Sequence, residues 1–285
     1  MNQELKENGY TIVPDVLTSE EVEQAKEMFY TWKDTVPNHD LIHKQCDPHG
    51  IYKYNQAGHQ EFAWFIRTRP AVKKVFADIW ETDELTVSFD GSCYISKDIQ
   101  GTDDFWCHSD QSPKYNELKC YQGFVSLTDN IERSLVVWDK THLMHHDYFS
   151  QLGREKDSSN WQRIPKEDED KLLPYKKVLP VTAGSMVLWD SRLFHQNQYG
   201  ETPEERIVQY VCMLPKNVKE NSTAQKTKRQ LYFYTKRMTS HWPYPIRVNA
   251  LQPRHWGNEE LMIDYNKLVV PNLTPYMTEI QELIH

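Results

Sequence analysis

The hydrophobic pattern has two regimes, with helical spacing in the first third of the chain and alternation through the middle. Apolar residues from Val22 to Trp32 recur every three or four positions, which predicts an amphipathic helix over 19–33. Thr18 and Glu21 have the spacing of a capping box, in which each side chain satisfies a free backbone amide. We therefore expect a well-defined helix ahead of the β-rich part of the chain.

Local signals predict further elements on either side of that part. A short strand is expected over 9–13, and a second helix from Pro70, because proline is favoured in the first helical turn. A terminal helix is expected over 275–284. The stretch 37–60 is rich in His, Asn, Gly and Pro, so we expect it to be irregular.

From about residue 85 the period becomes two, in short segments rich in Val, Leu, Phe and Tyr. We predict strands over 85–89, 91–96, 104–109, 119–128, 134–138, 178–181, 185–190, 192–197 and 206–214. Many short strands broken by turns predict a mainly β (α+β) fold, arranged as an antiparallel sandwich or barrel. The polar stretch 150–173 is expected to be a lid or a disordered insert, and 228–235 one more strand.

Composition favours a single globular unit. With 285 residues and 39% hydrophobic content, the chain can bury one sizeable core. We expect one domain over 1–285, with a core over about 85–215 and a C-terminal extension over 216–285. No apolar run approaches the ~20 residues that span a bilayer, and the start does not resemble a signal peptide. A soluble cytoplasmic protein with no membrane partner is expected.

The net charge of −8 opposes general attraction to nucleic acid. The segment 216–237, however, carries seven Lys/Arg residues against one Glu, a local charge of +6. It is either a solvated basic loop leading into a strand or a docking surface for an acidic substrate or partner.

Candidate metal ligands come from two places in the chain. His108 and Asp110 are two apart, so they project to the same side of an extended strand. His195 lies at the end of the predicted strand 192–197. Two His and one Asp can hold Fe(II) on one face and leave positions open for a co-substrate and oxygen.

A candidate co-substrate residue follows the second histidine. If a hairpin is centred between Gly200 and Glu201, His195 and Arg206 are directly opposed and project to the same face. A guanidinium forks onto a carboxylate through two parallel hydrogen bonds, which suits the distal carboxylate of 2-oxoglutarate. Asn197 shares that face and is expected to add a hydrogen bond. These residues together predict an Fe(II)/2-oxoglutarate oxygenase.

The chain also resembles the phytanoyl-CoA dioxygenase-like family of Fe(II)/2-oxoglutarate oxygenases over roughly 8–214. The opening 8–18, the strand 184–190 before the distal histidine, the HxD motif at His108, and His195 and Arg206 are similar to that family's pattern. The resemblance implies a double-stranded β-helix, or jelly roll. The stretch 134–142 departs from the Gly-rich Pro-Gly-Ser-His segment common in the family, and keeps only its final histidine.

The expected reaction is hydroxylation of a substrate C–H with O2, releasing succinate and CO2. Further residues are expected to line the co-substrate pocket: Gln122, Phe124 and Ser126 on the strand after the HxD motif, and Tyr94 upstream of it. Nine residues in and after the irregular segment and in the extension are candidates either to meet the substrate or to be ordinary surface and core: His49, His59, Trp64, Arg67, Arg237, His241, Trp242, Arg247 and His255. A small acidic metabolite, an acyl thioester and a protein side chain all remain open as substrates.

Three alternatives stay open beside this interpretation. Zinc in the same triad would support hydrolysis, but Arg206 would then have no clear task. A degenerate site would leave a non-catalytic jelly-roll binding module. A nucleic-acid-associated substrate could use the basic segment 216–237, although the overall acidity makes this the weakest of the three.

Overall fold

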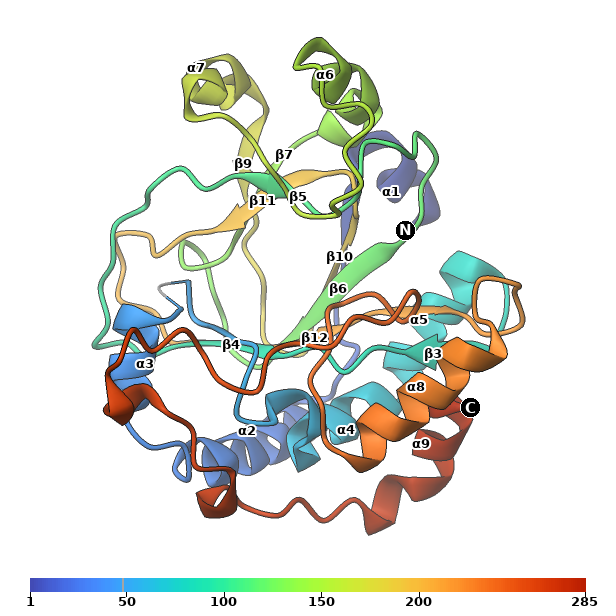
Figure 1. The fold of residues 1–285 in the computed structure, drawn as a ribbon. Coiled ribbons are helices and arrows are strands. Elements are labelled where there is room, and N and C mark those ends of the chain that lie inside the picture. Colours follow the sequence, from blue (N-terminus) through green and yellow to red (C-terminus); the bar gives the residue numbers. More distant parts are fainter. Residues whose placement is uncertain (48) are drawn as a thin grey trace.

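The computed structural model describes residues 1–47 and 49–285. Two antiparallel sheets face each other across the interior (Figure 1). The larger sheet has six strands in the order β1 (Tyr10–Val13), β10 (Met186–Asp190), β6 (Tyr121–Ser126), β12 (Arg206–Val211), β4 (Ser92–Ile95) and β2 (Ile51–Tyr52). The smaller has five in the order β8 (Gln162–Arg163), β5 (His108–Ser109), β11 (Phe194–Asn197), β7 (Leu135–Trp138) and β9 (Lys176–Val178). A separate pair joins β13 (Met213–Pro215) to β3 (Leu85–Val87).

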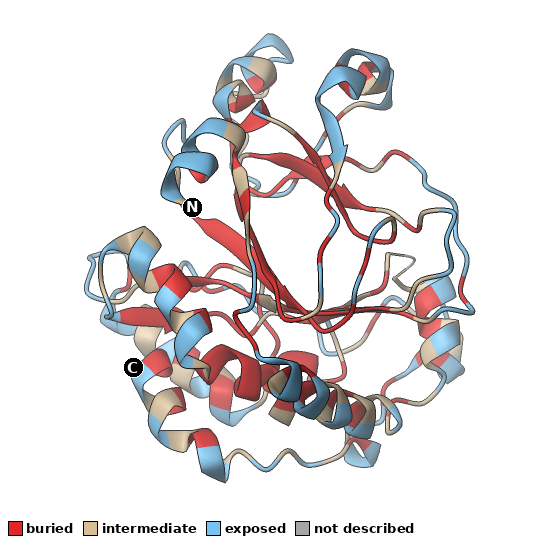
Figure 2. Ribbon diagram, turned by 180° about the vertical axis from the view of Figure 1, so that it is seen from behind, coloured by how far each residue is buried: buried red, intermediate tan, exposed pale blue. Residues whose placement is uncertain are grey.

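This arrangement confirms the predicted mainly β (α+β) class and its jelly-roll core. The interior-facing strands are buried almost throughout, as Figure 2 shows. Because both sheets turn one face inward, the space between them is enclosed by side chains from strands far apart in sequence.

Helices cover the outer face of the larger sheet. Figure 1 shows α2, α4, α8 and α9 beneath it, with α6 and α7 beside the smaller sheet. The α-helices are α1 (Asn2–Asn8), α2 (Ser19–Lys33), α3 (His39–Gln45), α4 (Glu61–Thr68), α5 (Pro70–Trp80), α6 (His145–Gln151), α7 (Glu169–Leu172), α8 (Thr223–Tyr234) and α9 (Met277–Ile284). Short 3₁₀ helices span Ala57–His59, Thr141–Leu143, Lys166–Asp168, Leu173–Tyr175, Glu259–Leu261, Tyr265–Lys267 and Thr274–Tyr276.

Local sequence signals placed several of these helices correctly. The capping box forms at the start of α2, where the Glu21 amide donates to Thr18 Oγ1 and the Thr18 amide donates to Glu21 Oε2. Helix α5 begins at Pro70. The predicted terminal helix is α9.

The C-terminal extension shares the core of the rest of the chain. Phe233 of α8 and Ile280 of α9 belong to the same hydrophobic cluster as Phe29 of α2 and Trp64 of α4. Phe233 meets the Trp64 ring edge-on, with 5.5 Å between ring centroids. The extension is thus packed against the helices that support the larger sheet.

Two local predictions were wrong. The segment 228–234 lies in helix α8 instead of a strand, because Arg229 and Phe233, four positions apart, are its buried side chains. The segment 37–60 is not wholly irregular, since it contains α3. Of the two alternatives for the insert 150–173, the structure contradicts the disordered one, because the insert forms β8, whose Arg163 pairs with His108 of β5. The lid alternative stays a prediction.

The predicted hairpin between His195 and Arg206 is also wrong. β11 pairs with β5 and β7 in the smaller sheet, whereas β12 pairs with β4 and β6 in the larger one. The turn after β11 carries the chain from one sheet to the other.

Among the described residues, no helix is both long enough and apolar enough to cross a membrane.

Candidate metal centre

The structure brings the three predicted ligands together on the inner side of the smaller sheet. His108 of β5 and His195 of β11 are register partners, and Asp110 directly follows β5. Oδ2 of Asp110 lies 3.3 Å from Nε2 of His195 and 3.8 Å from Nε2 of His108. One donor atom from each residue lies within 4.8 Å of the other two, so a single ion can contact all three.

Backbone carbonyls orient both imidazoles. Nδ1 of His195 lies 2.9 Å from the Leu193 carbonyl oxygen, and Nδ1 of His108 lies 3.3 Å from that of Trp106. A carbonyl only accepts, so each Nδ1 carries the proton and each Nε2 offers its lone pair to the shared centre. Burial lowers the pKa of His108 to about 3, which keeps that ring neutral.

The carboxylate is held in its ionised form. Burial alone would raise the pKa of Asp110, but its electrostatic and hydrogen-bond interactions with the neighbouring imidazoles, those of His108 first, hold that pKa well below its usual range. Nε2 of Gln122 also donates to Oδ2 of Asp110 at 3.1 Å. Neutral imidazoles beside an ionised carboxylate form a donor set suited to a divalent cation.

Arg206 extends into the interior from the opposite sheet. It is 1% exposed, and among the described residues neither of its terminal guanidinium nitrogens has a hydrogen-bond partner. The guanidinium carbon lies 5.5 Å from the centroid of the Phe124 ring. A buried cation without an acceptor is costly, so this arrangement fits a bound anion that accepts from both nitrogens. The distal carboxylate of 2-oxoglutarate meets that requirement.

The other residues predicted for the co-substrate pocket divide into two groups. Gln122 and Asn197 line the cavity at the triad, and Phe124 lies against the Arg206 guanidinium. The structure does not bring Ser126 or Tyr94 there. The Ser126 hydroxyl donates to the Thr128 carbonyl, and Tyr94 packs against Phe29 on the outer, helix-covered face of its strand.

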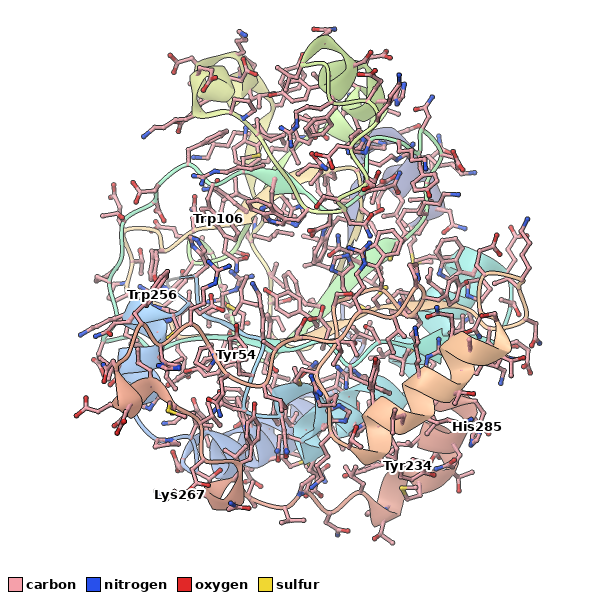
Figure 3. All side chains as sticks on the ribbon, viewed as in Figure 1. Tyr54, Trp106, Tyr234, Trp256, Lys267 and His285 are labelled. Atoms are coloured by element: carbon pink, nitrogen blue, oxygen red, sulfur yellow. The ribbon has the colours of Figure 1, made fainter. Side chains whose placement is uncertain are left out.

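The cavity wall also includes Lys53, Asp90, Trp106, Trp161 and Tyr210, and none of them was predicted. The Trp106 ring, labelled in Figure 3, stacks on the His108 ring with 5.0 Å between centroids. Because side chains two positions apart lie on the same face of an extended strand, the spacing of Trp106 and His108 could have predicted this contact. Tyr210 lies four positions after Arg206 in β12, so the same alternation could have placed it on the face that carries Arg206. Lys53, Asp90 and Trp161 come from separate segments, and no regular spacing along the chain relates them to the metal ligands.

The jelly-roll fold, the His/Asp/His centre and the opposed buried guanidinium define the class of the protein. It is a member of the superfamily of non-heme iron, 2-oxoglutarate-dependent oxygenases. Within that class, the chain belongs to the phytanoyl-CoA dioxygenase (PhyH) family, whose model matches residues 5–208.

Relatives and solved structures agree with this assignment. The chain is 31% identical over 199 residues to Ava biosynthesis cluster protein O of Aspergillus versicolor, covering 64% of this chain and 63% of that protein. It spans less than two thirds of the length of the curated relatives it matches.

Two solved structures share the fold at low identity. GlcNAc Inducible Gene 2, GIG2, from Candida albicans has a TM-score of 0.68 at 13% identity, covering 99% of this chain and 75% of that one. The epimerase SnoN in complex with Fe3+, alpha ketoglutarate and nogalamycin RO has a TM-score of 0.50 at 16% identity, covering 75% and 81% of the two chains.

Proposed function

We propose that this protein is an Fe(II)- and 2-oxoglutarate-dependent dioxygenase that hydroxylates a C–H bond of a small molecule. The observation that carries the proposal is the buried Arg206 guanidinium, whose two terminal nitrogens have no acceptor among residues 1–47 and 49–285 and which lies in the sheet opposite His108, Asp110 and His195. A metal centre alone would not need that cation. A co-substrate that chelates the metal at one end and carries a carboxylate at the other accounts for both features.

With iron, 2-oxoglutarate and O2 bound, the site supplies oxidising chemistry. One oxygen atom of O2 enters the substrate as C–OH, and the other enters succinate as 2-oxoglutarate loses CO2. Atoms and electrons balance in this reaction without any further reductant.

The chain's own residues position these groups. His108, Asp110 and His195 would hold the iron, and Arg206 would bind the distal carboxylate of the co-substrate. Gln122 donates to Asp110 and limits rotation of its carboxylate. The low exposure of all three ligands excludes most water from the centre.

Two comparisons support the proposal. The SnoN structure, which shares the fold, contains Fe3+ and alpha ketoglutarate. The relative from Aspergillus versicolor is named for a biosynthesis cluster, which favours a small-molecule substrate over a protein or nucleic acid. A zinc hydrolase or a non-catalytic jelly roll would leave Arg206 without a task.

We also propose that residues 1–285 act as one oxygenase domain, because the extension contributes His241 to the cavity wall. A cytoplasmic location fits the five cysteines, all of which are free thiols.

An anaerobic titration tests the proposed function. Purified protein is mixed with Fe(II) and then 2-oxoglutarate, and visible absorption is recorded for the charge-transfer band of the metal–keto-acid chelate. We expect a band that is weakened in Arg206→Ala and absent in His195→Ala. A protein that binds iron but forms no band would contradict the co-substrate assignment.

A further inference from the structure

The cavity at the metal centre has a polar wall that the proposed cofactors do not use. Lys53 follows β2, Asp90 lies between β3 and β4, and His241 comes from the C-terminal extension. All three line the same cavity as His108 and Asp110. The extension lies beyond the stretch matched by the family model, so His241 is a feature of this chain's own tail.

These groups have few partners within the described part of the chain. Lys53 forms no ion pair or hydrogen bond there, and Nε2 of His241 is buried without a partner. The Asp90 carboxylate accepts one hydrogen bond, from the Gly91 amide to Oδ1 at 2.7 Å. Lys53 and Asp90 do not form an ion pair with each other, so each side chain can contact a molecule bound between them. Burial raises the pKa of Asp90, so its carboxylate gains from a cationic partner.

The backbone holds Asp90 firmly in place. Arg67 donates to the carbonyl oxygens of Gly58 and Asp90, which fixes the loop ahead of β4. Gly91 lies so close to the Tyr52 carbonyl oxygen that any Cβ there would collide with it. This close approach brings the loop of Asp90 against the end of β2, next to Lys53.

The extension is anchored at the same place. The Thr239 amide donates to the Phe89 carbonyl at 3.0 Å, and the Phe89 amide donates to Thr239 Oγ1 at 2.9 Å. His241 follows two residues later. Its ring lines the same cavity as Asp90 and the metal ligand Asp110. A group arranged in this way is preorganised to contact a substrate.

We propose that Lys53, Asp90 and His241 form the substrate-recognition site, and that it takes a compact zwitterion of the amino-acid type. The Lys53 ammonium would bind the substrate carboxylate, and the Asp90 carboxylate would accept from the substrate ammonium. Nε2 of His241, which is buried at the same cavity, would hydrogen-bond the same substrate. This inference rests on the proposed function, because it names the substrate of that same site.

Size and surroundings favour such a substrate over a long acyl chain. The cavity measures about 150 Å3, and a bound co-substrate takes much of that volume. Beside the co-substrate there is room only for a compact group. Trp106 and the half-exposed Trp161 line the other side of the cavity, so a short apolar side chain can pack against their rings.

The test uses matched sets of free amino acids, their N-acetyl derivatives and their carboxamides, added to the full-length protein with Fe(II) and 2-oxoglutarate. Anaerobically, binding is read from the change in the visible absorption of the chelate. In air, succinate and the oxygenated product are quantified. We expect at least one free amino acid to bind and to stimulate succinate release, with a loss of about 10-fold or more for either blocked form.

Two variants assign the contacts. Lys53→Met should bind the acid and its carboxamide equally, and Asp90→Asn should bind the free amine and its N-acetyl form equally. Exposed neighbours outside the cavity supply matched controls, and Lys97→Met and Asp98→Asn should keep the wild-type discrimination. Retention of the chelate absorption shows that each variant is folded. Discrimination unchanged in both test variants would overturn the assignment.

The failure of this inference is separable from the failure of the proposed function. If the chelate forms but no zwitterion alters its absorption or stimulates succinate release, the substrate class is wrong and the oxygenase assignment stands. If iron binds and no chelate forms with 2-oxoglutarate, both proposals fall together.

Discussion

Arg206 and His195 belong to opposite sheets, and both side chains are buried in the interior of the sandwich. His195 is the register partner of Val137 in the smaller sheet, and Arg206 is the partner of Ile95 in the larger one. The space between the metal ligand and the guanidinium is therefore set by how the two sheets pack. A co-substrate that joins the two would also bridge the sheets.

Replacing Arg206 with methionine should separate stability from co-substrate binding. An uncompensated buried cation is unfavourable, so the apo variant is expected to be more stable than wild type by about 1–3 kcal/mol. The KM for 2-oxoglutarate should rise at least about 100-fold, since the charged hydrogen bonds are lost. Thermal unfolding with and without 2-oxoglutarate, together with succinate assays, measures both effects. An apo variant that unfolds at lower temperature would argue that Arg206 has a structural partner.

Replacing Asp110 with alanine should remove iron and abolish turnover. Two imidazoles alone lack the ionised oxygen that lies 3.3 Å from His195 and 3.8 Å from His108. Metal content after dialysis against Fe(II), and succinate release, are the measurements. The exposed Asp98→Ala is the control and should keep both. Succinate production at the wild-type rate in the Asp110 variant would show that another residue completes the centre.

Gln122→Leu tests a residue that acts through the metal ligand. Its side-chain amide donates to Oδ2 of Asp110 at 3.1 Å, and loss of such a contact typically weakens metal affinity 10- to 100-fold. We expect a higher Kd for Fe(II), with little change in the KM for 2-oxoglutarate once the metal saturates. Restoration of metal affinity by Gln122→Asn would identify the amide as the source. A variant with unchanged Kd would reduce Gln122 to a packing role.

The sequence predictions that were confirmed depend on features set within a few residues of the chain. The capping box at Thr18, the proline at the start of α5 and the period of two all depend on neighbours in the chain. The ligand candidates His108 and Asp110 are likewise two residues apart. Such features can be read from one sequence because their geometry is set within a few residues.

The sequence predictions that were wrong depend on contacts between segments far apart in the chain. Periodicity cannot tell whether the strand after a turn stays in the same sheet, so the hairpin between His195 and Arg206 was predicted where the chain changes sheets. The aromatic residues at 232–234 favoured a strand, but packing against the core selected a helix. Lys53 and His241 lie at the same cavity only because of tertiary folding, so no spacing could have paired them.

His59 should make folding stability depend on pH. Its Nε2 lies 2.9 Å from the Arg237 carbonyl oxygen, and burial lowers its pKa from 6.5 to about 3. Below pH 6.5 the unfolded chain therefore binds a proton that the folded chain excludes. The contribution of this group to stability is full above pH 6.5 and is lost as pH falls toward 3, at about 1.4 kcal/mol per pH unit.

Urea unfolding of wild type and His59→Gln at pH 7 and pH 5 measures this dependence. Glutamine can still donate to the Arg237 carbonyl but does not titrate. The variant should lose about 2 kcal/mol less stability than wild type between the two pH values. His285→Gln, an exposed change at the end of α9, serves as the control for the loss of an imidazole. Equal losses in wild type and His59→Gln would mean that His59 is protonated in the folded protein, and that its burial is relieved by a partner other than Arg237.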